Sequence, residues 1–461
     1  MASSCLRKGM VHSMPQQTQR NERMERTELG NGIHFTAIHD ERFKQNQISL
    51  NFLLPLRRET ATLYALLPLM LRRGCREFPD MTALNRRLKE LYGAHIDGST
   101  GKRGEVQIVT LYCDSLSNGY AFGGEDVLAQ CAALLRAVAF EPALENGVFR
   151  AADMAVEKRN LSDMIEAQLN EKRQYATMRL REEMCRGEAY GVSELGRRED
   201  VAGITAEALV RAWKDMLERS RVEIFLVGPG EPSGVRDSFA SAFANAAFAN
   251  AAFENAGRGE PYDIQTQVVK TAGEPRTVVE RLPVAQSKLV MGLRAGVAAP
   301  ENTDAMQLAC AILGGTPQSK FFLNVREKKS LCYYCLSYYE RYKGLVFFDS
   351  GIEEKNFDAA REEMLLQLKL LQNGDFTDDE MRFAKLSLRN ALTQVNDSLE
   401  AMSVYYLGQA LAGTFRTAGE AADAIDAVSR EEAAAAAKGI ALDTVYLLAG
   451  EQAAEGETSL Q

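Results

Sequence analysis

The stretch LGGTPQSKFFLNVREKKSLCYYCLSYYERYKGLVFFDSGI, residues 313–352, decides the fold of this chain. It opens with two glycines and continues as a charged segment that predicts a helical turn from Phe322 to Lys329. A tyrosine-rich run and then a second apolar run follow. Because aromatic and β-branched residues favour strands, we predict two strands joined by a turn near residues 341–344.

The order of residues in this stretch resembles the C-terminal half of the insulinase/pitrilysin-like (inverzincin) metallopeptidases, a family that includes the mitochondrial processing peptidases. The family pattern is Gly-Gly, Ser, Arg-Glu-Lys, Leu, Tyr and a Gly before an apolar strand. This chain carries the same pattern at Gly314, Gly315, Ser319, Arg326, Glu327, Lys328, Leu331, Tyr333 and Gly344. The resemblance implies an α+β fold with two homologous insulinase-like domains of the LuxS/processing-peptidase type. Each would be a mainly antiparallel sheet packed with helices, and the two would face each other across a cavity.

Length and composition are those of a globular protein with more than one domain. The 461 residues exceed what one hydrophobic core usually supports, and 46% apolar and 25% charged residues are ordinary proportions. A net charge of −9 argues against a nucleic-acid partner, and no apolar run approaches the roughly 18 residues of a membrane span. The start of the sequence lacks the apolar segment of a secretory signal, and the eight cysteines are scattered, so we expect a cytoplasmic protein.

We predict four segments along the chain. They are a disordered tail (1–26), an N-terminal insulinase-like domain (27–240), a linker (241–275) and a C-terminal insulinase-like domain (276–461). The linker contains the consecutive copies AFANA, AFANA and AFENA within residues 242–256. Three copies of five residues are too short for a solenoid, so we interpret them as simple-sequence expansion in a helix or linker.

The resemblance directs attention to a zinc site in the first half. The family carries an inverted motif, His-x-x-Glu-His, on the helix that we predict at residues 60–73. Two His side chains one turn apart hold the zinc, and the Glu activates the zinc-bound water. In the aligned stretch ALLPLMLRRG, Ala65 replaces the first His, Pro68 the Glu and Leu69 the second His. A proline inside a helix also costs about 3 kcal/mol, so this helix no longer has the features of a metal site.

The third zinc ligand of the family is a Glu on a later helix. The register places Met164 at this position, and Glu157 and Glu166 are shifted alternatives. The chain has four histidines, and none is paired with a second one on a predicted helix. We therefore expect no metal, no cofactor and no peptidase activity for the chain on its own.

In active relatives, the Arg and the Tyr that match Arg326 and Tyr333 reach across the cavity to the substrate beside the zinc. Both residue types suit this role because they donate hydrogen bonds to a developing oxyanion. The alternative is that Arg326 pairs locally with Glu327 and that Tyr333 packs in a sheet. Since both residues are present while every zinc-motif group is lost, we interpret them as substrate-binding residues.

The leading hypothesis is a non-catalytic subunit that binds peptide and completes the active site of a zinc-bearing insulinase-like paralogue. Zinc would then lie only in that partner of the heterodimer, as in mitochondrial processing peptidase and in paired bacterial peptidases. A peptide-binding or scaffold protein without a proteolytic role is the alternative. A hydrolase that uses an unrecognised site is a third, weaker reading.

Cys332 and Cys335 form a single C-x-x-C on the first of the two predicted strands. Residues three apart on a strand point to opposite faces, so we expect plain strand residues here.

Overall fold

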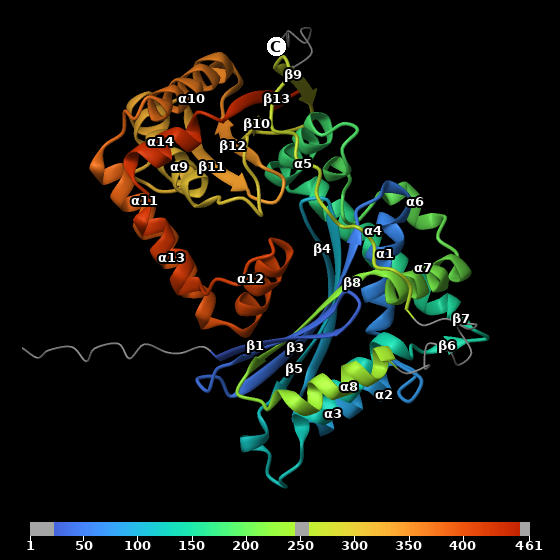
Figure 1. Ribbon diagram of the computed structural model, residues 1–461. Coiled ribbons are helices and arrows are strands. Elements are labelled where there is room, and N and C mark those ends of the chain that lie inside the picture. The colour runs from blue at the N-terminus through green and yellow to red at the C-terminus, as the bar shows by residue number, and fades with distance from the viewer. Residues whose placement is uncertain (1–22, 245–257, 452–461) are drawn as a thin grey trace, which may run out of the picture.

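The computed structural model describes residues 23–244 and 258–451 of the chain. They form two α+β lobes, each built on one sheet with helices packed against it (Figure 1). The strands of the first sheet lie in the order β1 (Arg23–Gly30), β2 (Ile33–His39), β8 (Arg221–Gly228), β3 (Gln45–Pro55), β5 (Val106–Leu116) and β4 (His95–Arg103). Those of the second sheet lie in the order β11 (Cys332–Glu340), β12 (Leu345–Ile352), β10 (Ser287–Arg294), β13 (Ala441–Ala449) and β9 (Arg276–Arg281).

The two sheets share one topology once β1 is set aside. We number the five strands of each sheet along the chain, starting at β2 in the first sheet and at β9 in the second. In both sheets the strands then lie side by side in the order 1-5-2-4-3. In both sheets the first and last strands are parallel and the other neighbours are antiparallel. This common order confirms the prediction of two homologous, mainly antiparallel domains.

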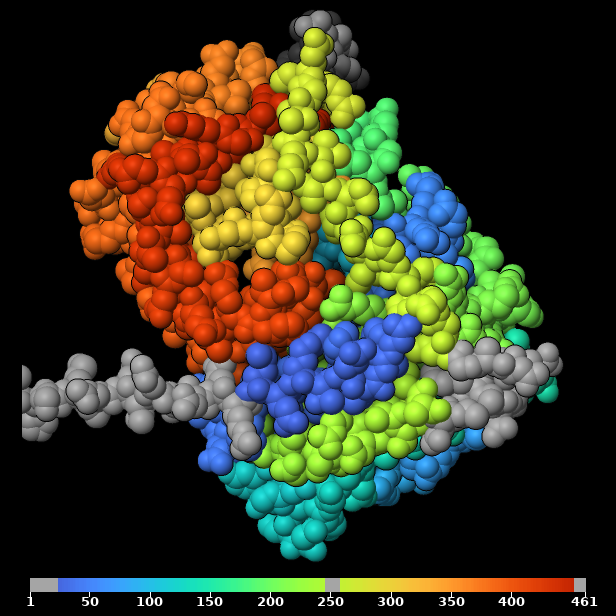
Figure 2. All heavy atoms as spheres, in the orientation of Figure 1, coloured from blue at the N-terminus to red at the C-terminus, as the bar shows by residue number. Residues whose placement is uncertain are grey.

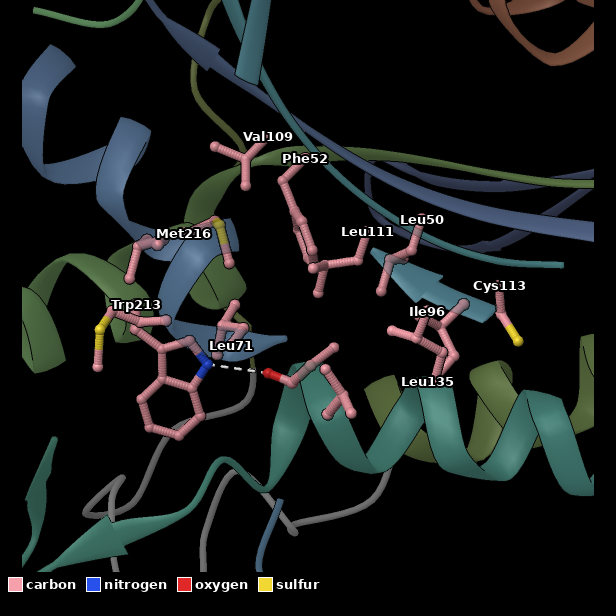
Figure 3. Close-up of a cluster of buried hydrophobic side chains, with 14 of the residues drawn as sticks. Leu50, Phe52, Leu71, Ile96, Val109, Leu111, Cys113, Leu135, Trp213 and Met216 are labelled. Carbon is pink, nitrogen blue, oxygen red and sulfur yellow. Dashed lines mark hydrogen bonds between the residues drawn. The ribbon is translucent and has the colours of Figure 1, made fainter. Parts of the chain in front are cut away.

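The largest apolar core lies between the outer face of the first sheet and the helices that cover it. These helices are α1 (Arg58–Leu71), α2 (Met81–Glu90), α3 (Val127–Phe140), α4 (Ala151–Asn170), α6 (Arg198–Ala202), α7 (Ala206–Arg219) and α8 (Pro232–Ala244). Figure 3 shows Phe52 of β3, Leu111 of β5 and Trp213 of α7 in this interior. The indole Nε1 of Trp213 donates a 2.9 Å hydrogen bond to the carbonyl oxygen of Ala139, so its polar group is satisfied inside the core.

The second lobe has an equivalent core on the outer face of its own sheet. Its helices are α9 (Asp304–Gly314), α10 (Phe357–Gln372), α11 (Asp378–Gln394) and α14 (Arg430–Ala437), and α13 (Ala418–Ala427) packs on α11 and α9. A capping box begins α11: the Thr377 side chain accepts a hydrogen bond from the Glu380 backbone N–H, and the Glu380 side chain accepts one from the Thr377 backbone N–H.

Each half of the chain also covers the inner face of the other half's sheet. Helix α12 (Leu399–Leu411), from the second half, packs Met402 and Tyr406 against the inner face of the first sheet. Helix α5 (Lys172–Met184), from the first half, packs on β10, β12 and β13 (Figure 1). A Cβ at Gly292 of β10 would lie 2.4 Å from the sulfur of Met184, so only glycine lets α5 approach this closely. The two lobes are therefore held together by packing in both directions.

A buried ionic network also joins the lobes. Lys343, in the turn between β11 and β12, is fully buried, and its Nζ lies 2.6 Å from Glu105 Oε1 and 2.7 Å from Glu188 Oε2. Glu188 also binds Arg294 of β10 at 2.7 Å, and Arg294 lies 3.0 Å from Asp443. Glu105 and Glu188 belong to the first half and the other three residues to the second, so the pairs of Lys343 with Glu105 and Glu188, and of Arg294 with Glu188, join the two lobes.

Several boundaries differ from those expected from sequence. Strand β1 begins at Arg23, inside the predicted tail, and residues 1–22 lie outside the described residues. The first lobe continues to the end of α8 at Ala244, beyond residue 240, while β9 begins at Arg276. Most of the AFANA repeat falls in 245–257, which also lie outside the described residues.

The prediction that Cys332 and Cys335 point to opposite faces is wrong. Both are buried in the core on the outer side of the second sheet. A β-bulge between Cys332 and Tyr334 shifts the alternation of β11 by one residue, which brings the two cysteines to the same face.

No helix within residues 23–244 and 258–451 combines the length and apolar character needed to cross a bilayer. The longest helix in these ranges, α4, has 20 residues and carries several charged side chains.

Candidate functional site

The positions of the lost zinc motif lie in the apolar core of the first lobe. Ala65 and Leu69 of α1 have 2% and 5% of their surface exposed, and both belong to the core between the helices and the first sheet. A catalytic zinc needs N, O or S ligands and an open position for water. Neither side chain carries a donor atom and neither position opens to solvent, so this part of α1 is a packing element.

Pro68 lies inside α1, opposite a glycine on the neighbouring edge strand. The helix continues past it to Leu71 although a proline there removes a backbone donor at a cost of about 3 kcal/mol. Strand β4 runs so close that a Cβ at Gly98 would lie 2.8 Å from the Cβ of Pro68 and 3.1 Å from the carbonyl oxygen of Thr110. Pro68 and Gly98 therefore fit each other at the position that carries the Glu of the motif.

Glu157, one of the alternatives for the third ligand, is buried and already bound by other side chains. Its Oε1 accepts a 2.7 Å hydrogen bond from Arg73, its Oε2 accepts one of 2.8 Å from Asn160, and Arg72 lies 4.0 Å away. Arg73 also pairs with Asp153 at 2.7 Å. Burial lowers the pKa of Arg73, but the hydrogen bond to Glu157 and the charges of Asp153 and Glu157 outweigh it, so the pKa is raised. Two guanidinium groups at this carboxylate oppose the binding of a metal cation.

The other two positions for the third ligand lie elsewhere on α4. Met164 is 42% exposed, and Glu166 forms an ion pair with Arg198 of α6. Among the described residues, no group of three or more His, Cys, Asp or Glu side chains is arranged to hold a metal ion.

Arg326 and Tyr333 lie at one corner of the second lobe, on either side of a tight connection. Arg326 is on a π-helix, Phe321–Lys328, and Tyr333 is the extra residue at the bulge of β11. Ser330 between them has a φ of 51°, and its backbone N–H donates a 3.0 Å hydrogen bond to the carbonyl oxygen of Arg326. π-Helical turns are rare and often occur at functional sites.

Both side chains are exposed and weakly held. The Arg326 guanidinium lies over the ring of Phe322 at 4.6 Å, and its Nε is 3.7 Å from Glu327. Tyr333 is 57% exposed, and its hydroxyl donates a long 3.4 Å hydrogen bond to Glu353. The structure therefore contains the local Arg326–Glu327 pair of the alternative interpretation, whereas Tyr333 is not packed in the sheet.

The structure brings Arg326 and Tyr333 to one corner but separates them from the zinc-motif positions of their own chain. Those positions are enclosed in the first-lobe core, whereas Arg326 and Tyr333 lie on the second lobe. Sequence reasoning also missed a pocket between the lobes, to which neither Arg326 nor Tyr333 contributes. Its lining comes from β4, the α4–α5 region, the loop after α5, β11 and β12, and no local pattern marks it.

Comparison with known proteins identifies the family. Residues 203–388 match the family model described as Peptidase M16 inactive domain. The chain is 30% identical over 424 residues to the probable inactive metalloprotease YmfF of Bacillus subtilis (strain 168), covering 92% of this chain and 97% of that protein. This chain belongs to the M16 peptidase family. The insulinase-like resemblance of residues 313–352 is thereby confirmed.

Solved structures agree with this assignment. A conserved protein from Enterococcus faecalis V583 has 26% identity and a TM-score of 0.81, over 93% of this chain and 99% of that one. The peptidase M16 inactive domain from Pseudomonas fluorescens shares the fold at 17% identity, with a TM-score of 0.73, over 94% and 100% of the two chains. With all three motif groups replaced, the chain is a catalytically inactive M16 peptidase homologue.

Purified alone, the chain should retain no zinc after dialysis and cleave no peptide. The reason is the replacement of both histidines and the catalytic Glu by Ala65, Leu69 and Pro68, in a segment closed to water. Metal analysis by mass spectrometry, together with a fluorogenic peptide library, checks this expectation. About one tightly bound zinc per chain with chelator-sensitive cleavage would contradict it.

Proposed function

We propose that this chain is the non-catalytic subunit of an M16 peptidase complex in the cytoplasm, where it binds peptide and completes the active site of a zinc-bearing paralogue. The zinc and the general base then belong to the partner. This chain supplies Arg326 and Tyr333, which donate to the substrate carbonyl as negative charge develops on its oxygen.

The observation that carries the proposal is the exposure of Arg326 and Tyr333 on a locally constrained backbone. An ion pair of 3.7 Å between two exposed side chains, such as Arg326 and Glu327, contributes at most about 1 kcal/mol. A 3.4 Å contact from Tyr333 to Glu353 is weak as well. The Arg326 and Tyr333 side chains thus contribute little to the stability of the fold, while the π-helix and the bulge fix the backbone that carries them.

A scaffold that holds peptides without cleavage is the second candidate. The closed zinc-motif segment and the absence of a metal cluster among the described residues are equally compatible with it. The two functions differ in the partner, because a scaffold does not require a zinc-bearing relative.

Co-expression with an M16 relative that retains His-x-x-Glu-His, encoded in the same genome, tests the proposal. We expect the two chains to elute together in size-exclusion chromatography and to hydrolyse peptides in a reaction that a chelator stops. The matched control is the same relative with the Glu of its motif changed to Gln, which should assemble without activity. Separate elution of the two intact chains would favour the scaffold function.

A further inference from the structure

The space between the two lobes contains a polar pocket of about 490 Å³, within the size range of ligand sites. In Figure 2 the two lobes touch each other, and a hollow opens between them. The pocket is bounded by β4 and α5 of the first half, by β11 and β12 of the second, and by the loop after α5. The residues that matter for its chemistry are Lys102, Glu171, Arg173, Gln174, Thr177, Arg181, Ser193, Glu194, Tyr338 and Asp349.

Among the charged groups of the pocket, Arg181 is the one cation that has no carboxylate partner in the described part of the chain. Arg173 pairs with Asp349 at 2.5 Å, and Lys102 lies 3.5 Å from Glu194. The remaining carboxylate, Glu171, accepts hydrogen bonds from backbone N–H groups at the start of α5. No Asp or Glu oxygen of residues 23–244 and 258–451 lies within 4 Å of the guanidinium of Arg181.

Aromatic rings surround the Arg181 guanidinium. It lies 5.4 Å from the ring centre of Phe347 and 5.9 Å from that of Tyr190, and its buried Nε has no hydrogen-bond partner among the described residues. A buried donor without a partner is costly, so holding the Arg181 side chain here destabilises the fold unless its guanidinium gains another partner. Burial and the charge of Arg181 lower the pKa of the neighbouring Lys102, whereas the charge of Glu194 raises it. Burial lowers the pKa of Arg181 itself, but interactions with Tyr190, Tyr338, Glu340 and Glu194 outweigh it, so the pKa is raised.

We propose that this pocket binds a carboxylate group of a peptide, with Arg181 as its principal ligand. The planar guanidinium presents paired donors that match a carboxylate, and the hydroxyls of Thr177 and Ser193 line the same space. A single negative charge suits the site better than a dianion such as phosphate, because Glu171, Glu194 and Asp349 also face it and would repel a second charge. The carboxylate site is argued from the pocket alone, and only the statement that the ligand is a peptide rests on the proposed function.

Isothermal titration of the full chain alone, without any partner, tests the site. The ligands are N-acetyl-trialanine with a free C-terminus, its C-terminal amide, an amidated peptide with one Glu side chain, and inorganic phosphate. We expect the free acid to bind at least about tenfold more tightly than the amide, since a hydrogen bond to a charged group contributes that much. Comparable binding of the amidated Glu peptide would identify a side-chain carboxylate as an equally good ligand.

Arg181→Gln should abolish the preference for the free acid, whereas the matched Arg179→Gln should preserve it, because Arg179 is paired with Glu280 and lies outside the pocket. If Arg181→Gln fails to fold, Gln174→Glu at the exposed wall adds a repelling charge and should weaken free-acid binding severalfold. Equal binding of acid and amide, tighter binding of phosphate, or no binding of the free acid at millimolar concentration would overturn the inference. Because no partner is present in the titration, such a result would not contradict the proposed complex, which is tested separately by co-expression.

Discussion

Replacement of Lys343 by methionine is expected to lower the free energy of unfolding by about 3–5 kcal/mol, the usual cost of removing one partner of a buried ion pair. Methionine has a similar volume, so the loss is mainly electrostatic. The Nζ of Lys343 is fully buried and serves both Glu105 and Glu188, which are themselves largely buried. Without it, the Glu105 carboxylate has no cationic partner among the described residues, in a largely buried position.

Urea unfolding followed by circular dichroism measures the effect. The control is Lys270→Met, which removes an exposed pair with Glu301 and should cost at most about 1 kcal/mol. Adding Glu105→Gln to Lys343→Met should recover part of the lost stability because the buried charge is then removed. If Lys343→Met were as stable as the Lys270→Met control, the ionic network would not be a main contact between the lobes.

The second large effect concerns the proposed complex. Arg326→Ala and Tyr333→Phe should each lower peptide turnover by roughly 100-fold or more, the typical cost of losing one oxyanion donor. Both side chains are exposed and weakly paired in this chain, so neither change should alter its folding or its assembly with the partner.

The matched control for these variants is Lys328→Ala. Lys328 lies on the same π-helix as Arg326 and is exposed, with its Nζ bound to Asn324 at 2.9 Å. Its removal changes the surface charge of the same corner by the same amount and should leave turnover within about twofold. A loss as large as that of Arg326→Ala would mean that the corner acts through its general charge rather than through a specific donor.

Much of the fold could be predicted because the signals are local. The capping box at Thr377, the glycine turn at Gly344 and the apolar run of β12 each specify their own structure within a few residues. Strands β1 and β4 have a weaker local signal because both are edge strands. Half of the residues of β1 are charged, and β4 contains Gly98 and Gly101, so neither has the apolar alternation of a central strand.

The contacts between the halves could not be predicted from local patterns. The sequences of α5 and α12 have only weak apolar periodicity, and nothing in them shows that each helix packs on the sheet of the other half. The same limit applies to Lys343 and Glu105, which are 238 positions apart. At the zinc motif, the substitutions were evident from sequence, whereas the enclosure of Ala65 and Leu69 and the binding of Glu157 by Arg73 required the structure.

The most direct test of the central claim is the turnover of the zinc-bearing paralogue under three conditions with equal zinc content. It is measured alone, with this chain, and with the double variant Arg326→Ala/Tyr333→Phe. The account predicts that the paralogue alone is at least about 100-fold less active, that this chain restores activity, and that the double variant assembles but does not. Full activity of the paralogue alone, or full restoration by the assembled double variant, would contradict the claim that this chain completes the active site.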